Sequence, residues 1–303
     1  MTAATTTPPA PSVVTRRRAP VHWSRVGLHV FLAAMAVLWL LPLLWAIFIA
    51  LRPISDTTQR GYVSLPNSLT LGNFFDAWTQ GDLLRNYVQT LSIVIPGVII
   101  TLLVASMIAF AVTKFSWRFN LGILMLFVAG NLLPQQVIIV PLYRLYLWLP
   151  IPAPLSDNDV LYNQTVGILL IHIVFQTGFC VFVLSNYMKT LSKELTEAGL
   201  VDGASVFRIW WSIILPLCRP ALAALATLEF TFIYNDFFWG LLLIKSGDRR
   251  PITSALNNLQ GQFFTNYNLL AACSVLVAIP TIVVYILLQK QFIRGLTLGS
   301  TKG

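Results

Sequence analysis

Residues 193–216 read KELTEAGLVDGASVFRIWWSIILP and stand between two apolar runs that are each long enough to cross a membrane. Ser192 and Thr196 can cap helix starts, and Gly203 can supply a turn that a side chain would obstruct. Pro216 stands near the start of the second apolar run, where a helix tolerates proline. The stretch therefore predicts two short helices joined by a turn, on the cytoplasmic side of a membrane protein.

The composition also indicates a membrane protein. Of the 303 residues, 56% are hydrophobic and only 10% are charged, and the mean hydropathy is +0.74. A soluble core of this length does not need so much apolar surface. The net charge of +9 could suggest nucleic acid, but the basic residues lie at the edges of long apolar runs, where the positive-inside rule accounts for them. We therefore expect the lipid bilayer as a partner and no nucleic acid.

Six apolar runs are predicted to be transmembrane helices, each able to cross about 30 Å of hydrocarbon. The first, 28–51, would be about 36 Å long as a helix. It is too long for the core of a signal peptide and lacks a clear small-residue cleavage site. The other runs are 87–112, 121–145, 162–187, 210–233 and 269–288. These runs predict an all-α membrane protein with six transmembrane helices.

An even number of spans puts both termini on the same side of the membrane. Of the 20 lysines and arginines, 13 fall on the side of the termini and 7 on the other. Because basic residues concentrate in cytoplasmic loops, both termini are predicted to be cytoplasmic. The predicted domains are a disordered basic tail at 1–26, a six-helix transmembrane domain at 27–289 with the loop at about 189–216, and a cytoplasmic tail at 290–303.

No catalytic or metal-binding pattern occurs in the sequence. The histidines have no ligand neighbour at i+3 or i+4, and His29 and His172, which lie in spans, are expected to pack against other helices. The three cysteines are isolated in apolar helices and act as small hydrophobic side chains. A glycine-rich phosphate-binding loop is missing too. We therefore expect no catalytic residue, no metal site and no cofactor in this chain.

The loop resembles the coupling loop of the permeases of binding-protein-dependent ABC importers. The matching residues are Glu197, Ala198 and Gly199 for the family's E-A-A, Gly203 for its glycine, and Ile213, Leu215 and Pro216 for its closing I-x-L-P. Three further patches are similar to sugar permeases of the maltose-uptake type: an N-x-x-P pattern that runs from Asn131 to Tyr143, the aromatic segment 234–239, and the tail at 291–303 with Arg294 and Gly295. The resemblance spans most of 27–303.

This resemblance implies the fold of a type I ABC importer permease. Gly199 departs from the family's usual Ala, which adds up to about 1 kcal/mol of helix cost and would loosen the first coupling helix. The implied roles in the loop are charges at the cleft of an ATPase for Glu197 and Asp202, small residues that permit close approach for Ala198 and Gly203, and a rigid element for Pro216.

The resemblance also implies partners and a place in the cell. The chain would form half of a translocation path with a second permease in a heterodimer, and two ATPase subunits would bind ATP and Mg²⁺. The outer segments 52–86, 146–161 and 234–268 would face an extracytoplasmic solute-binding protein. Within the first, LTLGNFFDAW predicts an interfacial helix, with a partner contact as the alternative. The expected location is the bacterial inner or plasma membrane.

The translocation path is expected to gather polar groups in the spans beside aromatic rings, which suits a neutral sugar or polyol. Glu229 is the one clear acid inside a span, and it would contact either a sugar hydroxyl or a neighbouring helix. Pro134 and Pro141 predict bends in the third span. The path candidates are Asn131, Pro134, Gln135, Glu229, Tyr234, Asn235 and Asp236.

An ion-coupled secondary carrier is the alternative function, because it too would lack a nucleotide site. Such a carrier normally shows internal inverted repeats and intramembrane acids or unwound half-helices that hold the driving ion. No such repeat is visible in this sequence. The resemblance of the loop at 193–216 therefore favours the ATP-driven importer.

Overall fold

The computed structural model describes residues 23–260 and 265–297, and the side chains of 290–297 are not part of the description. Residues 1–22 of the predicted tail and residues 298–303 lie outside the described residues. The described part is helical and contains no strand. Its α-helices are α1 (Trp23–Ala50), α2 (Ile54–Arg60), α3 (Gly72–Gln80), α4 (Leu83–Lys114), α5 (Asn120–Leu132), α6 (Ile139–Trp148), α7 (Thr165–Met188), α8 (Glu194–Val201), α9 (Val206–Ile209), α10 (Leu215–Leu217), α11 (Arg219–Tyr234), α12 (Phe238–Leu243), α13 (Ile252–Ala255) and α14 (Tyr267–Thr297).

The chain divides into two compact units, Met1–Trp45 and Ala46–Gly303. The described part of the first unit is the stretch of α1 up to Trp45. The second unit contains the last turn of α1 and every other helix. We describe the second unit from here on, because it holds the loop at 189–216.

Four helices are long and apolar enough to cross a membrane: Arg25–Ala50, Leu83–Lys114, Thr165–Met188 and Tyr267–Gln289. Two bent pairs bring the number to six if each pair counts as one span: Asn120–Leu132 with Gln135–Trp148, and Val206–Leu217 with Arg219–Tyr234. The six predicted spans are therefore all present as apolar helical segments, but the third and the fifth are broken.

The break in the third span lies at Pro134. α5 ends at Leu132, and its axis meets that of the following helix at 88°. Leu133 is extended because the ring of Pro134 disfavours helical backbone in the residue before it. Pro141 was expected to kink the span as well. It instead lies in the first turn of α6, where helices tolerate proline, so it marks no second break.

The fifth span was predicted as one helix at 210–233, and this was wrong. The chain bends by 78° at Cys218, between α10 and α11. Pro220 stands in the first turn of α11 and has no N–H to donate to the carbonyl of Pro216, so the helical hydrogen-bond ladder is interrupted there. The bend separates the coupling segment from the buried part of the span.

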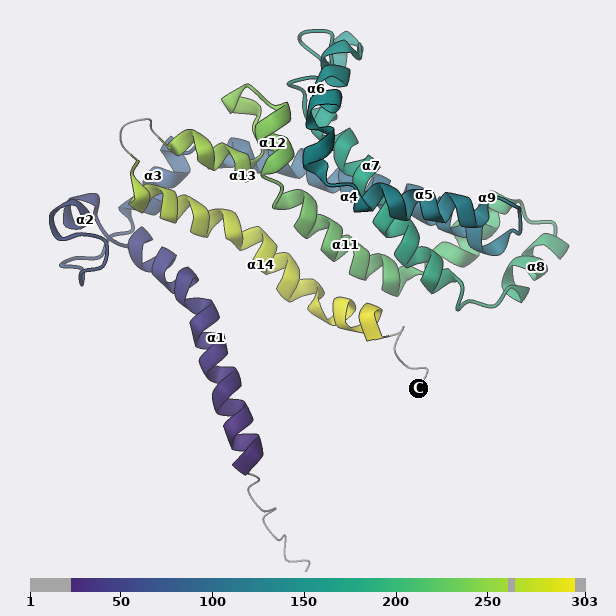
Figure 1. The fold of residues 1–303 in the computed structure, drawn as a ribbon, viewed down its shortest axis with the longest axis horizontal. Coiled ribbons are helices and arrows are strands. Elements are labelled where there is room, and N and C mark those ends of the chain that lie inside the picture. Colours follow the sequence, from purple (N-terminus) through teal and green to yellow (C-terminus); the bar gives the residue numbers. More distant parts are fainter. Residues whose placement is uncertain (1–22, 261–264, 298–303) are drawn as a thin grey trace, which may run out of the picture. The chain divides into compact units, whose positions relative to one another are not determined.

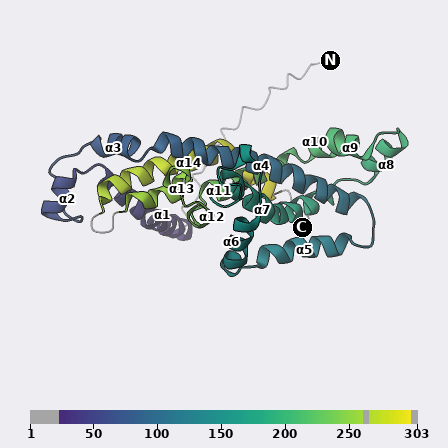
Figure 2. The same ribbon diagram turned by 90° about the horizontal axis from the view of Figure 1, so that it is seen from above.

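α4 is the central helix of the second unit. It packs along α7 and also contacts α11, and α11 packs along α14 (Figures 1 and 2). Two tyrosines tie α14 to its neighbours. The hydroxyl of Tyr87 on α4 donates to the carbonyl of Leu276 at 2.7 Å, and that of Tyr234 on α11 donates to the carbonyl of Val277 at 2.9 Å.

Two groups of short helices mark opposite ends of this unit. α8 and α9 lie at one end of the long helices, and α2 lies at the other end, in both views (Figures 1 and 2). The loop at 189–216 and the first outer segment are therefore separated by the length of the spans, as the six-span topology predicts.

Candidate functional site

The side chain of Ser192, and not that of the predicted Thr196, bonds to the backbone at the start of α8, although the N-cap position itself is occupied by Lys193. The Oγ of Ser192 accepts the backbone N–H of Glu194 at 3.1 Å. Thr196 lies inside α8, and its buried hydroxyl has no hydrogen-bond partner among the described residues. The second cap is Ser205, whose Oγ accepts the N–H of Arg208 at the start of α9. The spacing of Ser205 before an apolar run was the available signal for this cap.

Gly203 makes the turn between α8 and α9, as the sequence predicted. Its φ is +76°, a left-handed conformation that favours glycine. Its N–H donates to the carbonyl of Leu200 at 3.1 Å, and the N–H of Ala204 donates to that of Gly199 at 3.0 Å. A Cβ at Gly203 would meet nothing within 4 Å. The turn therefore needs glycine for its backbone conformation, and not because a side chain would be obstructed within this chain.

Gly199 is the residue where α8 and α9 come closest. It is buried, and a Cβ there would lie 3.0 Å from the Cγ1 and 3.2 Å from the Cδ1 of Ile209, with the Cδ1 of Ile213 at 3.5 Å. An alanine would have to push Ile209 aside by a few tenths of an ångström. The departure from the family's Ala thus coincides with a tight contact between the two coupling helices.

The outward side of this helix pair is free of internal contacts. Glu197, Ala198 and Asp202 are exposed, and Val201 has 86% of its surface exposed. Neither Glu197 nor Asp202 forms an ion pair with any residue that the structure describes. The loop therefore offers two unpaired carboxylates and an apolar side chain to a partner.

The segment after α9 is a π-helix, Trp210–Ile214, which the sequence analysis did not predict. Pro216 is the signal that could have revealed it. Its ring would clash with the carbonyl of Ser212 in a regular α-helix, and the N–H of Leu215 donates to the carbonyl of Trp210, five residues back. Pro216 is thus a structural element near the bend at Cys218.

The coupling loop is also joined to the end of α4. The ammonium group of Lys114, the last residue of α4, donates to the carbonyl of Leu191 at 2.7 Å. A groove of about 380 Å³ lies between α4 and α9, and its walls include Phe110, Phe115 and Trp210. The loop is therefore joined to two spans, to α4 by this hydrogen bond and to α11 through the bend.

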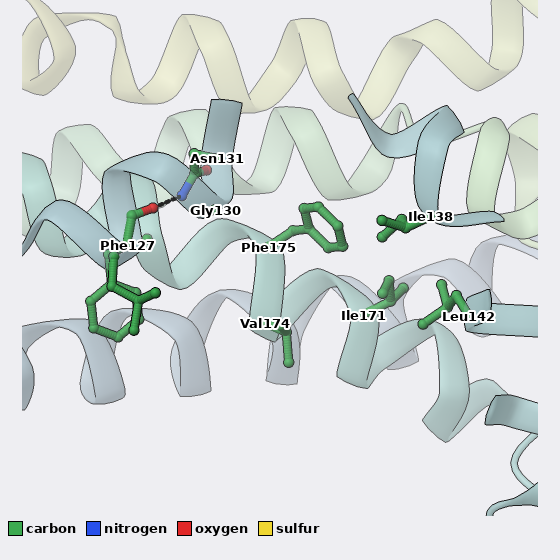
Figure 3. A pocket seen from close by; sticks show the side chains of 10 residues that line it. Phe127, Gly130, Asn131, Ile138, Leu142, Ile171, Val174 and Phe175 are labelled. Atoms are coloured by element: carbon green, nitrogen blue, oxygen red, sulfur yellow. Dashed lines mark hydrogen bonds between the residues drawn. The ribbon is translucent and has the colours of Figure 1, made fainter. Parts of the chain in front are cut away.

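Among the predicted path residues, Asn131 lines a groove. This groove has about 400 Å³ and lies between α5, α6 and α7, with apolar walls such as Phe127, Phe175 and Ile138 (Figure 3). The amide of Asn131 donates to the carbonyl of Phe127 at 3.0 Å. Gly178 on α7 allows the close approach, since a Cβ there would clash with Asn131.

Glu229 and Tyr234 lie apart from Asn131 and are fully buried within the chain. The Oε1 of Glu229 accepts the thiol of Cys180 on α7 at 3.2 Å, and its Oε2 has no partner among the described residues. Of the two contacts considered for Glu229, the structure thus shows the one with a neighbouring helix. Tyr234 uses its hydroxyl to hold α14.

Asn235 and Asp236 shape the turn after α11. The carboxylate of Asp236 accepts the N–H groups of Trp239 and Gly240, at 3.3 and 3.2 Å, at the start of α12. His172 was expected to be a packing residue, and its Nε2 lies 3.6 Å from Asp236. Asn235 is exposed and donates to the carbonyl of Thr231.

The remaining predicted residues lie at the break of the third span and near the end of α14. Pro134 forms the break described above, and Gln135 begins the 3-10 turn Gln135–Ile138. The backbone of Arg294 and Gly295 continues α14, but their side chains lie outside the described residues. The path candidates are therefore spread over several sites in this chain, whereas the loop candidates lie close together in the sequence, on α8, the turn after it and the segment that follows α9.

A family model described as the binding-protein-dependent transport system inner membrane component matches residues 97–297, which include the loop at 189–216. The chain belongs to this family. The permease is thus a membrane component of a transport system and not an enzyme.

Three relatives align with the permease over nearly their whole length. The arabinooligosaccharides transport system permease AraQ of Halalkalibacterium halodurans is 31% identical over 294 residues, which cover 95% of this chain and 99% of the relative. The xylose/arabinose import permease XacI of Haloferax volcanii is 29% identical, with 91% and 93% covered. A probable ABC transporter permease of Pyrococcus horikoshii is 30% identical, with 87% and 92% covered.

A solved structure confirms the predicted fold. The permease is similar to a chain of a bacterial ABC transporter involved in the import of the acidic polysaccharide alginate, with a TM-score of 0.73 and 20% sequence identity. The match covers 94% of this chain and 100% of that chain. The two proteins share the fold of an ABC importer permease.

Proposed function

We propose that the permease is the membrane subunit of an ATP-driven sugar importer and that α8 and α9 dock on an ATPase subunit. The exposed face of α8 carries this proposal, because it presents Glu197, Ala198 and Asp202 on a turn fixed by Gly203. ATP and Mg²⁺ would bind to that ATPase, and this chain would hold no cofactor. Membership of the family disfavours the alternative, an ion-coupled carrier.

The proposed partners complete a transport path. A second permease would supply the other half of the path, two ATPases would dock at the coupling loops, and an extracytoplasmic solute-binding protein would deliver the solute. Both termini would be cytoplasmic and the complex would lie in the bacterial cell membrane. The basic residues of the loops support this orientation, and the placement of α8 and α2 at opposite ends of the second unit agrees with it.

The proposed solute is a neutral sugar or oligosaccharide. The names of relatives support this class, since they include permeases for arabinooligosaccharides, xylose and arabinose, and alpha-glucosides. The apolar groove with the amide of Asn131 is one surface along which a sugar face could pass. Which sugar is carried would depend on the binding protein and on the second permease as well.

The proposed mechanism is alternating access. Closure of the ATPases would move α8 and α9 as one piece, since Gly199 and Ile209 hold them in contact. The motion would reach α11 across the bend at Cys218 and α4 through Lys114. Rigid-body rotation of packed helices is a usual way for such a displacement to open one side of a path and close the other.

Reconstitution in proteoliposomes tests this function. The permease alone should show no uptake under any ion gradient, and adding the second permease, the ATPase and the binding protein should give ATP-dependent uptake of labelled sugar. Glu229→Gln should alter that uptake only modestly, because ATP-driven transport does not require Glu229 to carry a proton. Accumulation driven by a proton or sodium gradient with the single chain, lost in Glu229→Gln, would support the carrier instead.

A further inference from the structure

The groove between α4 and α9 lies where the inner part of a span meets its end. α4 has 32 residues and is about 48 Å long, more than the roughly 30 Å of hydrocarbon that it crosses, so its last turn reaches the headgroup region. The groove is lined by hydrophobic side chains, among them Met107, Phe110, Ala111 and Phe115 from the end of α4 and the residue after it, and Phe207 and Trp210 from the segment around α9.

Trp210 carries a buried hydrogen-bond donor. Only 4% of its surface is exposed, and its indole Nε1 has no partner among the described residues. A buried indole N–H usually donates to an acceptor, and an unsatisfied one calls for an explanation. Because Trp210 is part of the lining, an acceptor oxygen on a molecule bound in the groove would satisfy this group.

The two chain segments that form the groove carry positive charge and no acid. Residues 83–156 and 203–228 contain no Asp or Glu, whereas Lys114, Arg118 and Arg208 each stand within three residues of a lining side chain. Arg118 and Arg208 are exposed, and neither forms an ion pair with any residue that the structure describes. The charge near the groove therefore suits an anionic group.

Exposed aromatic rings stand beside the groove in the sequence. Trp117 and Phe119 have about half of their surfaces exposed and pack edge to face, with ring centres 5.7 Å apart. Phe207 and Trp211 are exposed as well, and their rings are stacked at 6.4 Å. The guanidinium of Arg118 lies 4.6 Å from the centre of the Phe119 ring. Exposed tryptophans beside basic residues are typical of the headgroup level of a membrane.

We propose that this groove binds one anionic phospholipid, from the leaflet on the side of α8 and α9. An acyl chain would lie against the apolar lining, the phosphate would lie near Arg118 and Arg208, and a lipid oxygen would accept the N–H of Trp210. A soluble anion would leave the lining uncovered. An ATPase is disfavoured as the occupant because Met107 lies about 10 Å inside the span from Lys114.

The test uses the full complex in nanodiscs with phosphatidylglycerol that carries a photoactivatable diazirine in an acyl chain. Mass spectrometry should locate the adducts mainly on the groove lining. Unlabelled phosphatidylglycerol should compete at a mole fraction about tenfold lower than phosphatidylcholine with the same acyl chains, because two or three cations favour the anionic lipid. Adducts spread evenly over the exposed apolar helices, or equal competition by the two lipids, would show bulk lipid only and overturn the proposal.

A ring placed in the groove should displace the lipid. Ala111→Phe should lower the adducts on α9 by about fivefold or more, because the new side chain takes the place of the acyl chain. The matched control is Val104→Phe, which puts the same ring on an exposed position of α4 outside the lining. It should leave the adducts within about twofold of the wild type. Equal losses in both variants would contradict a site at this groove.

The charges and the indole are tested separately. Arg118→Gln with Arg208→Gln should remove most of the preference for phosphatidylglycerol, whereas Lys189→Gln with Arg219→Gln should retain it, since these two exposed cations do not stand beside the lining. Trp210→Phe keeps an aromatic ring without the N–H and should weaken the competition by about threefold. A preference unchanged in the Arg118, Arg208 double variant would overturn the anionic site.

A last arm compares the complex with the permease alone in the same nanodiscs. The groove adducts should be present in both. Adducts that form on the permease alone and vanish in the complex would show that a protein subunit covers the groove, and would overturn the proposal.

Discussion

The two ends of the second unit hold their turns in place by different contacts. Each presents a few exposed side chains on a fixed turn, and each turn contains a glycine with positive φ, Gly203 at +76° and Gly61 at +79°. These are the only glycines of that conformation in the described ranges 23–260 and 265–297. At the coupling end, the contact of Gly199 with Ile209 fixes the turn, whereas the fixed point at the outer end is the buried guanidinium of Arg52.

Because of this difference, the two ends are not equally suited to pass a displacement on to the spans. At the coupling end the helices themselves are in contact, and the bend at Cys218 and the bond of Lys114 join them to two spans. At the outer end, side-chain hydrogen bonds hold the backbone of a loop against the end of α1. The first arrangement is suited to passing on a displacement, and the second to holding the backbone of a loop in one place.

The largest expected effect is at Gly203. Leucine in its left-handed conformation would cost about 1–2 kcal/mol and distort the turn, so Gly203→Leu should insert in the membrane but abolish uptake. Gly203→Asn should keep most of the uptake, because asparagine tolerates this conformation and the space around Gly203 is open. Uptake assays on equal amounts of inserted protein measure both. Normal transport by Gly203→Leu would remove the coupling role of the turn.

A smaller effect is expected from reversing one charge on the same face. Glu197→Lys should weaken co-purification of the ATPase by about tenfold or more, since like charges across an interface are strongly unfavourable. Glu194→Lys is the matched control, because it makes the same charge change in the first turn of α8 at a position outside the predicted cleft contacts. If both variants retain the ATPase equally well, Glu197 has no special place in the contact.

The smallest effect is expected at Gly199. Alanine gains about 1 kcal/mol of helix propensity but presses on Ile209, so Gly199→Ala should change stability by less than about 1 kcal/mol. Adding Ile209→Val should relieve the pressure and make the double variant more stable than the two single changes sum to. Thermal unfolding of the purified permease measures this. Simple additivity would show that the two helices are not in tight contact.

The sequence predicted the apolar helical segments and the two short helices joined by a glycine turn, because local signals encode them. Hydropathy marks the runs, and Gly203 and Pro216 act on their immediate neighbours in the chain. The break at Cys218 was missed, although Arg219 and Pro220 interrupt the apolar run directly after it. Thr196 could not act as a cap because it lies inside α8, which begins at Glu194.

The hydrogen bond from α14 to the backbone of Arg52 could not be predicted from the sequence, because its two partners are distant along the chain. Asn268 lies more than two hundred residues from Arg52, and nothing local in either neighbourhood indicates that one binds the carbonyl of the other. Glu229 was recognised as unusual, but only the structure shows Cys180 beside it. The path candidates share this limit, since side-chain type alone does not determine which groups face one groove.

The loop at 61–65 and the helices α8 and α9 should face opposite sides of the membrane. Val63 and Val201 are matched probes, with 84% and 86% of their surfaces exposed, and the native cysteines are buried. An impermeant maleimide applied to intact cells should label Val63→Cys at once and Val201→Cys only after permeabilisation. Labelling of Val201→Cys from outside, or of both sites alike, would contradict the account.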